Sequence, residues 1–405
     1  MKKTITLLLT LFVTIPYTYA QTQAVNPEVK YRRSSLYTLM IHDETRPYAE
    51  VIRASFEKGP IPEKFNNHNL GNRVIPTSNA KDESQNITAF LADNNVARDI
   101  VAKWFNRSAK GGFNMDMIAE RGKYDANALD IAKAKASQRG LETLADAGEE
   151  LIKNTFILVN DYNYVSKEEV AKKASGWLNA IGSVASSAGL GDVSTTTTLT
   201  SAAVTVAGKG YVVKTTAHLY RLVWDEETAA IFYNDYWADD KTITPEKKKA
   251  FEESTIFKLE YIGSDTSWAD VQSSVFTKKT EEELIEKATV KAVDAVIVKL
   301  QKNHDEFKTK TPLFSGEPIS AKIGLKEGLT DKSKFDVLEQ VVNKEGKTEY
   351  VVVGTIKVDD KLPIWDNRYG ADEENPNSTE DRTYFKKVSG KDFYPGMLIV
   401  QKKGK

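Results

Sequence analysis

The spacing of the prolines constrains the fold of this chain more than any other feature. The first part carries Pro47, Pro60, Pro62 and Pro76, and the next proline is Pro245. Because proline interrupts both helices and central strands, this gap predicts long regular elements over residues 80–240. Prolines return after residue 310, which predicts a turn-rich module there; they are Pro312, Pro318, Pro363, Pro376 and Pro395.

The first twenty residues have the pattern of a secretory signal peptide. Two lysines precede an apolar run over residues 5–15, and the small residues Thr18 and Ala20 stand before Gln21. A run this short is unsuited to anchor a protein in a bilayer. The alternative is a buried first strand, which would leave the charge and the small residues unexplained. We therefore expect cleavage after Ala20 and an extracytoplasmic location, in the periplasm or at the cell surface.

Composition excludes several classes of protein. The 405 residues include no cysteine, so disulfides, thiolate nucleophiles, cysteine-ligated metals and a lipid-anchoring cysteine are all absent. With 56 basic and 57 acidic residues, overall charge favours neither nucleic acid nor an anionic membrane. Beyond the signal peptide, no segment is long and apolar enough for a transmembrane helix.

The segment up to residue 308 predicts strands alternating with helices. Residues 35–42 and 155–165 read as buried strands, 113–121 as a further strand, and 83–105 as one helix that Ser84 can cap. A helix with Tyr48, Ile52 and Phe56 on one face precedes Gly59, and the alanine-rich residues 126–153 are expected to be helical.

The second half of this part predicts a meander and a closing helix. Residues 210–237 read as a hairpin of two strands joined at Asp225–Glu227, and residues 254–263 as one more strand. Thr280 and Glu283 have capping-box spacing and open a helix that runs through Leu300. We therefore expect one α/β (α+β) domain over residues 21–308, with a mixed sheet and packed helices.

Residues 310–405 predict a separate small β module. Short runs of alternating apolar and polar residues lie between turn signals at Gly324, Gly328 and 343–346. Short strands without helices are typical of a small all-β barrel or sandwich.

The segment 174–208 is unusually poor in charge and predicts an insertion in the α/β domain. Trp177, Ile181, Val184 and Ala188 form one helical stripe, and a threonine-rich run follows a glycine-rich turn. A membrane hairpin at 174–225 would need an apolar face in strict alternation, and the alternation here slips. We expect a soluble, packed insertion rather than a membrane hairpin or a pore.

The order of elements resembles a known family. The stretches "MDMIAERGKYDA", "GEELIKNTFILVNDYNYV" and "AHLYRLVWDEETAAIF", followed by a closing helix, are similar to the periplasmic α/β domain of the curli-secretion channel family. That domain recurs in lipoprotein activators of peptidoglycan synthases and in a flagellar assembly protein, where a small β-barrel follows it. The resemblance covers residues 110–308 and the tail, and it implies a fold rather than a site. The channel family is lipid-anchored, whereas this chain lacks the required cysteine.

No residue is predicted to be catalytic, cofactor-binding or metal-ligating. The four histidines, His42, His68, His218 and His304, have no paired spacing, and the acidic stretch 366–381 lacks EF-hand spacing and reads as a solvated loop. No nucleophile elbow or phosphate-binding loop is present. Four carboxylates around the expected hairpin are either glycosidase acids that pair in three dimensions or ordinary turn residues; they are Asp161, Asp225, Glu226 and Asp235.

These observations favour a secreted, non-enzymatic cell-envelope protein that works through protein–protein or surface interaction, in envelope or surface-structure assembly. The expected partner is another envelope protein or a second copy of the chain, and not nucleic acid. The first alternative is an extracytoplasmic hydrolase acting on glycan or peptide with a carboxylate pair. The second is a component of an oligomeric secretion pore.

Overall fold

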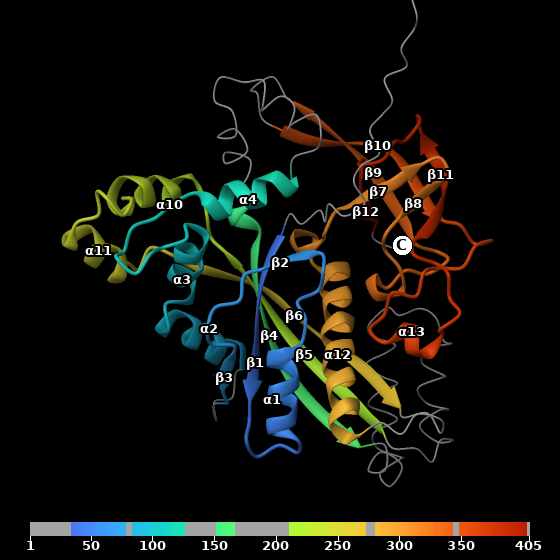
Figure 1. Ribbon diagram of the computed structural model, residues 1–405, viewed down its shortest axis with the longest axis horizontal. Helices are drawn as coiled ribbons and strands as arrows, with labels where there is room; N and C mark the ends of the chain where they lie inside the picture. The colour runs from blue at the N-terminus through green and yellow to red at the C-terminus, as the bar shows by residue number, and fades with distance from the viewer. Residues whose placement is uncertain are drawn as a thin grey trace, which may run out of the picture.

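The first part of the chain folds around one mixed β-sheet (Figure 1). The computed structural model describes residues 34–77, 83–125, 151–166, 210–272, 280–342 and 348–402. The strands are Ser34–His42 (β1), Phe65–Asn67 (β2), Val74–Pro76 (β3), Thr155–Ser166 (β4), Gly210–Leu222 (β5) and Leu259–Gln272 (β6). They lie in the order β2-β1-β4-β5-β6, with β3 beside the end of β1. Strand β1 is parallel to β2, β3 and β4, whereas β4, β5 and β6 are antiparallel.

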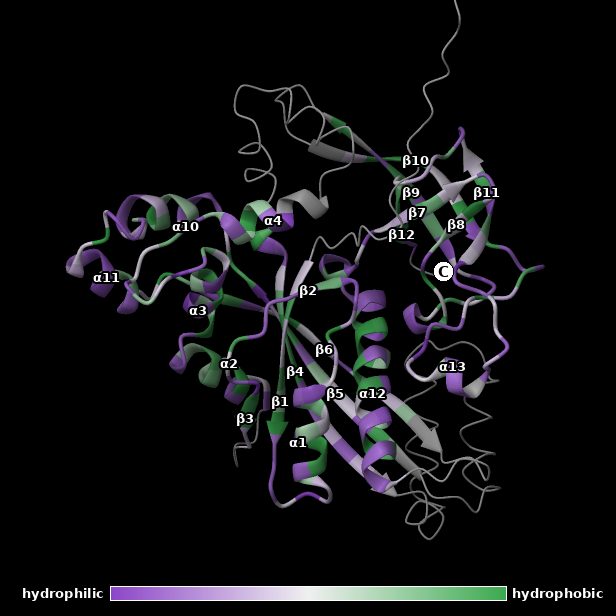
Figure 2. Cartoon of the chain, viewed as in Figure 1, coloured by the Kyte–Doolittle hydropathy of each residue, from purple (hydrophilic) through white to green (hydrophobic). Residues whose placement is uncertain are grey.

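Helices cover both faces of this sheet. They are Ala49–Lys58 (α1), Glu83–Asp93 (α2), Val96–Trp104 (α3), Asp116–Asp125 (α4), Glu226–Ile231 (α10), Pro245–Glu252 (α11) and Glu281–Asn303 (α12). Short helical turns are Ile152–Asn154 (η1), Phe232–Tyr236 (η2) and Asp305–Phe307 (η3). Hydrophobic and hydrophilic residues alternate around α12, as expected for a helix with one face against a sheet (Figure 2).

Strand β1 is buried along its whole length because both faces of the sheet are covered. Tyr37 and Leu39 point to the face where α2 and α3 pack. Leu36 and Met40 point to the opposite face, where α1 and α12 pack. Successive side chains of a strand alternate between faces, so a strand covered on both sides buries residues at every position, and in β1 these include the polar Ser35 and Thr38.

The second part of the chain is a closed six-stranded barrel in the order β10-β11-β8-β7-β12-β9. Its strands are Thr311–Gly316 (β7), Ile319–Ala321 (β8), Lys334–Val342 (β9), Thr348–Val358 (β10), Thr383–Gly390 (β11) and Leu398–Gln401 (β12). Two short helices, Leu325–Glu327 (η4) and Ala371–Glu374 (α13), lie in its connections. The predicted fold class, a mixed α/β sheet followed by a small all-β module, is confirmed, and the module is a barrel.

The barrel lies against α12 through contacts that belong to both parts. Lys326 Nζ lies 3.8 Å from an Asp294 carboxylate oxygen, and Lys287 Nζ lies 2.6 Å from Glu373. Between the two parts, the ring of Phe307 is fully buried. It belongs to the core cluster beneath α12, so the connection is anchored in the α/β core.

The predicted hairpin over residues 210–237 is wrong in its second half. Strand β5 ends at Leu222, and the expected turn begins helix α10 instead. Asp225 is the N-cap of this helix, and its carboxylate accepts a hydrogen bond from the Thr228 N–H at 2.8 Å. The β-prone aromatic residues that follow lie in the π-helical turn η2, where they pack into an aromatic cluster rather than a sheet.

Two further element predictions are wrong. The expected strand over 113–121 is a loop followed by helix α4, which carries Ile118 into the core. The expected single helix over 83–105 is two helices, because Asn95 adopts a left-handed conformation with φ of 51° and starts α3 in a new direction. Ser84 lies inside the first turn of α2, which begins at Glu83.

Other local predictions are confirmed. Strands β1 and β4 and helix α1 cover the expected residues, and Thr280 and Glu283 form both bonds of the capping box that opens α12. The insertion 174–208 and most of the helix expected over 126–153 lie outside the described residues; its last residues, 151–153, form a turn and the start of η1. Across the ranges that the structure describes, no helix has the length and hydropathy to cross a membrane.

Candidate functional site

Charged side chains gather near the carboxyl end of β1, where the chain turns into α1. Arg46, in this turn, donates from Nη1 to an Asp161 carboxylate oxygen in β4 and, at 2.8 Å, to the Tyr162 carbonyl. Its Nε lies 3.3 Å from Asp43. Arg46 therefore holds the carboxylates of Asp43 and Asp161 together at the carboxyl end of β1.

A third carboxylate and a histidine extend this group. Glu83 begins α2, and its Oε1 lies 3.8 Å from Nε2 of His218 in β5. Helix α2 is fixed to the same strand, because the Tyr220 hydroxyl donates to the Ser84 carbonyl at 3.2 Å. We call this group the carboxyl-edge cluster; its members are Asp43, Arg46, Glu83, Asp161 and His218.

The carboxyl-edge cluster changes the protonation of Glu83. Partial burial raises the pKa of the Glu83 carboxyl, and the nearby Asp161 carboxylate raises it further, whereas Arg46 opposes both effects. A carboxyl group with a raised pKa beside an ionised one is the arrangement from which general acids are built. Glu83 therefore keeps its proton to a higher pH than an ordinary glutamate does.

The structure separates the carboxylates that the sequence grouped around the expected hairpin. Asp161 pairs in register with Thr216 of β5, and that strand runs on for six residues to Leu222. Six strand residues span ~20 Å, and Asp225 lies beyond the end of the strand. The chain brings Glu83 to Asp161 instead, and it leaves Asp225, Glu226 and Asp235 on α10 and η2 as cap and turn residues.

The four histidines occupy separate elements. They are His42 at the end of β1, His68 after β2, His218 in β5 and His304 at the end of α12. In the part of the chain that the structure describes, no group of three or more His, Asp or Glu is placed to hold a metal ion.

The stretch 366–381 was interpreted as a solvated acidic loop. Two of its carboxylates accept hydrogen bonds from neighbouring arginines, Asp366 from Arg368 at 2.8 and 2.6 Å and Asp381 from Arg382 at 2.6 Å, whereas Glu373 accepts from Lys287 of α12. These local pairs use the carboxylate oxygens within the loop itself.

His68 belongs to a buried stack that the sequence did not reveal. Its ring lies 5.2 Å from that of Trp104, and the guanidinium of Arg121 lies over the same indole at 4.3 Å. Arg121 donates to His68 Nδ1 at 2.8 Å and to Ser35 Oγ at 2.9 Å. Burial lowers the pKa of Arg121 to about 10 and lowers that of His68. These groups satisfy one another inside the core, which indicates a structural role.

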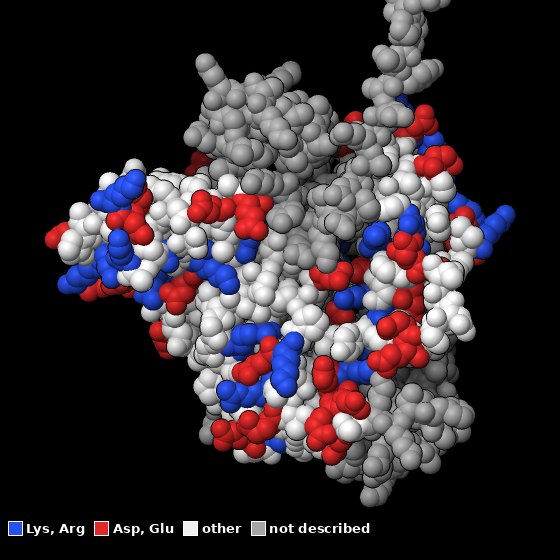
Figure 3. All heavy atoms as spheres, viewed as in Figure 1, with Lys and Arg blue, Asp and Glu red and all other residues white. Residues whose placement is uncertain are grey.

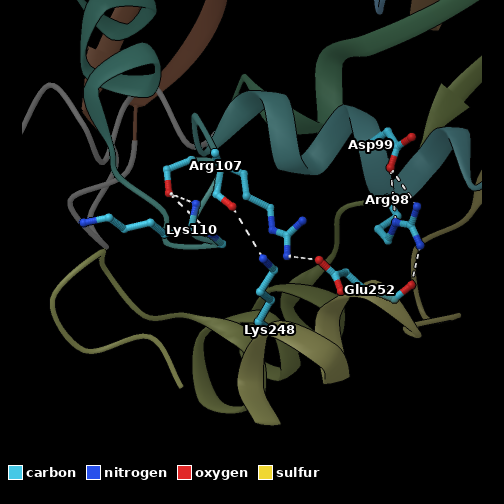
Figure 4. Close-up of polar contacts among 9 residues, drawn as sticks. Arg98, Asp99, Arg107, Lys110, Lys248 and Glu252 are labelled. Carbon is cyan, nitrogen blue, oxygen red and sulfur yellow. Dashed lines mark hydrogen bonds and ion pairs between the residues drawn. The ribbon is translucent and has the colours of Figure 1, made fainter. Parts of the chain in front are cut away.

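A second polar network joins helix α3 and the loop after it to helix α11 (Figure 4). Arg107 lies 3.1 Å from a Glu252 carboxylate oxygen, Arg98 donates to the Glu252 carbonyl, and Lys248 donates to the Ala109 carbonyl at 3.4 Å. Each cation meets an acceptor on the other element, so the network braces the two. On the face shown in Figure 3, basic and acidic residues are intermixed.

Two paired segments, Glu339–Val342 of β9 and Thr348–Val352 of β10, extend from the barrel, and we call them the β9–β10 arm (Figure 1). Val351 and Val352 are 39% and 61% exposed. Consecutive strand residues point to opposite faces, so these two valines expose apolar area on opposite faces of the arm. The arm also touches the connection between the two parts, because Lys310 Nζ lies 5.2 Å from the Tyr350 ring centroid.

A scan against protein-family models found no match for this chain, and a search of curated proteins found none either.

Proposed function

We propose that this chain is an exported, non-enzymatic cell-envelope protein that acts by binding another envelope protein, in the assembly of envelope or surface structures. Export is supported by the signal-peptide pattern of residues 1–20. Assembly is supported by the resemblance to the periplasmic α/β domain of the curli-secretion channel family and to the flagellar assembly protein in which a barrel follows that domain. The order of the two parts in this chain agrees with that resemblance.

The β9–β10 arm is the observation that carries the binding proposal. A two-stranded ribbon is only marginally stable in water, so a ribbon that extends beyond a barrel gains from contact with another surface. Val351 and Val352 expose apolar area on both faces, and valine has a strong preference for strands. Such an arm suits a partner that offers an apolar groove or an exposed strand edge.

Site-specific photo-crosslinking tests the arm as the binding surface. A crosslinking residue at Val352 should give one discrete adduct with an envelope protein in intact cells. The matched control is Leu362, which is 45% exposed on the barrel outside the arm. An adduct with a second copy of this chain would identify self-association in place of a different partner. Equal labelling from both positions, or none from Val352, would contradict the proposal.

The proposed location has its own test. The protein recovered from the extracytoplasmic fraction should have the mass of a chain that begins at Gln21. Replacing the apolar run of residues 5–15 with polar residues should keep the full-length chain in the cytoplasm. Full-length protein in the extracytoplasmic fraction would contradict the proposed cleavage.

A hydrolase acting on glycan or peptide is the second candidate, and the carboxyl-edge cluster is the observation that favours it. Glu83 would act as general acid and Asp161 as the second carboxyl group. Glu83→Gln would then abolish release of soluble fragments from purified peptidoglycan, while Glu44→Gln, an exposed change in the β1–α1 turn, would leave it intact. Absence of any release by the parent protein would count against this candidate.

A further inference from the structure

One side of helix α12 carries charged residues toward the barrel. Lys287, Lys291 and Asp294 follow one another at spacings of four and three residues, which places them on the same side of a helix. Lys287 Nζ lies 2.6 Å from a Glu373 carboxylate oxygen of the barrel. An Asp294 carboxylate oxygen lies 3.8 Å from Lys326 Nζ. These side chains therefore form an interface between the two parts, which we call the α12–barrel interface.

The charges on the two sides of the α12–barrel interface are matched in sign. Each of the three α12 residues has a barrel residue of opposite charge close enough to interact with it electrostatically; the pairs are Lys287–Glu373, Lys291–Asp366 and Asp294–Lys326. Along α12 the order of charges is positive, positive, negative, and the barrel partners have the opposite signs in the same order. Complementary charges of this kind fix the register of two surfaces and so select one docked position.

The barrel partners belong to a single docking surface, because two hydrogen bonds join the connections that carry them. The Leu325 N–H of η4 donates to the Trp365 carbonyl at 2.9 Å. The next N–H, that of Lys326, donates to Asn367 Oδ1 at 2.8 Å. The connection that contains η4 and the connection that contains Asp366 are therefore expected to move together with the barrel.

The α12–barrel interface is polar and loosely packed. Each of the apolar clusters found among the described residues lies wholly in the α/β domain or wholly in the barrel. A hollow of about 40 Å³ also remains where Gln301 and Lys308 meet Glu327 and Leu329 of the barrel. Polar interfaces between two parts of one chain commonly permit relative motion.

The connection between the two parts has one anchored end. The ring centroid of Phe307 lies 5.3 Å from that of Phe65 and 5.0 Å from that of Phe156, both in the α/β core. Strand β7 begins at Thr311, so only residues 308–310 link the anchored ring to the barrel. In the docked state Gln301 Nε2 donates to Thr309 Oγ1 at 3.3 Å. Once that bond opens, backbone rotations at residues 308–310 can turn the barrel without unfolding either part.

We propose that the barrel docks reversibly on α12, held by these charge pairs, and turns away about residues 308–310 when the pairs are screened or broken. The docked and open states are close in free energy, because partly exposed ion pairs contribute little to docking. Turning the barrel changes the direction of the β9–β10 arm relative to the α/β domain, since the arm extends from barrel strands. This motion does not depend on the proposed function.

Distance measurement by double electron–electron resonance tests the motion in the full mature chain. The chain has no cysteine, so spin labels attach only at introduced cysteines, here Arg53→Cys on α1 and Lys361→Cys between β10 and β11. At ~10 mM salt, where the Debye length is ~30 Å, we expect one narrow distance distribution. At ~1 M salt, where the Debye length is ~3 Å, a second and broader population should appear, and the ratio of open to docked molecules should rise about tenfold.

A charge swap locates the effect at the interface. Glu373→Lys places two ammonium groups together and should raise the ratio of open to docked molecules about tenfold under the low-salt condition. Adding Lys287→Glu to that variant recreates a pair of opposite charges and should restore the docked distance. Asp392→Lys, at a fully exposed position of the barrel, is the matched control and should leave the distance distribution unchanged. Circular dichroism and thermal unfolding verify that every variant is folded.

Three outcomes would overturn the proposal. The first is a single distance that is the same at low and high salt, which would indicate a rigid joint. The second is a broad distribution already at low salt, which would show that the barrel does not dock on α12. The third is a folded Glu373→Lys variant that keeps the docked distance, or a swapped variant that stays open.

Discussion

At the scale of single residues, Asp294 makes folding depend on pH. Its pKa is raised from 3.8 to about 6 in the folded protein, so between these values the native state binds more protons than the unfolded state. The free energy of unfolding therefore falls as pH rises through about 6, by at most ~3 kcal/mol. Asp294→Asn should remove this fall and be the more stable protein near pH 7, while matching the parent near pH 4.

Denaturant unfolding across this pH range measures the effect. Asp331→Asn, at an exposed position, is the matched control and should follow the parent curve. A parallel pH dependence for Asp294→Asn and the parent would show that Asp294 does not titrate in this range.

Gly112 gives a second prediction at this scale, because its neighbours leave no room for a side chain. An added Cβ would lie 2.5 Å from the Asp240 backbone nitrogen and 2.7 Å from the Asp239 carbonyl carbon. Gly112→Ala should cost ~1–3 kcal/mol in the free energy of unfolding, as overpacking usually does. Gly71→Ala, where no atom lies within 4 Å, should change stability by less than ~0.5 kcal/mol. Equal effects in thermal unfolding would contradict the packing around residue 112.

At the scale of elements, Asp225 distinguishes the observed helix from the expected hairpin. As the N-cap of α10 its carboxylate accepts from the Thr228 N–H. Asp225→Ala should therefore cost ~1 kcal/mol, whereas Asp225→Asn, which keeps an acceptor, should cost little. Chemical denaturation measures both changes. An Asp225→Ala variant with the same free energy of unfolding as the parent would argue against this N-cap.

Features that depend on residues close in sequence could be predicted from the sequence. Features that depend on packing between distant residues could not. The capping box of α12 needs only Thr280 and Glu283, three residues apart, so its spacing identified it. Residues 231–236 have strong strand preference, but Phe232 stacks on Phe105 at 4.3 Å and other aromatic rings complete the cluster. Tertiary contacts outweigh such preferences.

The carboxyl-edge cluster was missed for the same reason. Arg46 and Asp161 are 115 residues apart, and Glu83 reaches them only because α2 packs on β5. The one available signal was Arg46 beside Asp43 after an apolar strand, which is an ordinary feature of a turn.

At the scale of the whole molecule, the two parts should fold independently. Phe307 belongs to the α/β core, whereas the barrel encloses a core cluster of its own. The ion pair between Lys287 of α12 and Glu373 of the barrel has one partner, Glu373, that is 53% exposed, and exposed pairs contribute ~1 kcal/mol or less. Fragments 34–308 and 309–402 should each unfold cooperatively in circular dichroism. A fragment that is unfolded alone but folds on addition of the other would contradict this division.

Strand β12 gives the barrel a late closing step when the chain emerges amino-terminus first from a ribosome or an export channel. The α/β sheet has all its strands once residue 272 is out, and α12 is complete at residue 303. The barrel must wait for residues 398–401, because β12 lies between β7 and β9 and pairs with both. Until then β7 and β9 present unpaired edges, which are prone to aggregation. We therefore expect the protein to need a holding chaperone mainly while its last hundred residues are emerging.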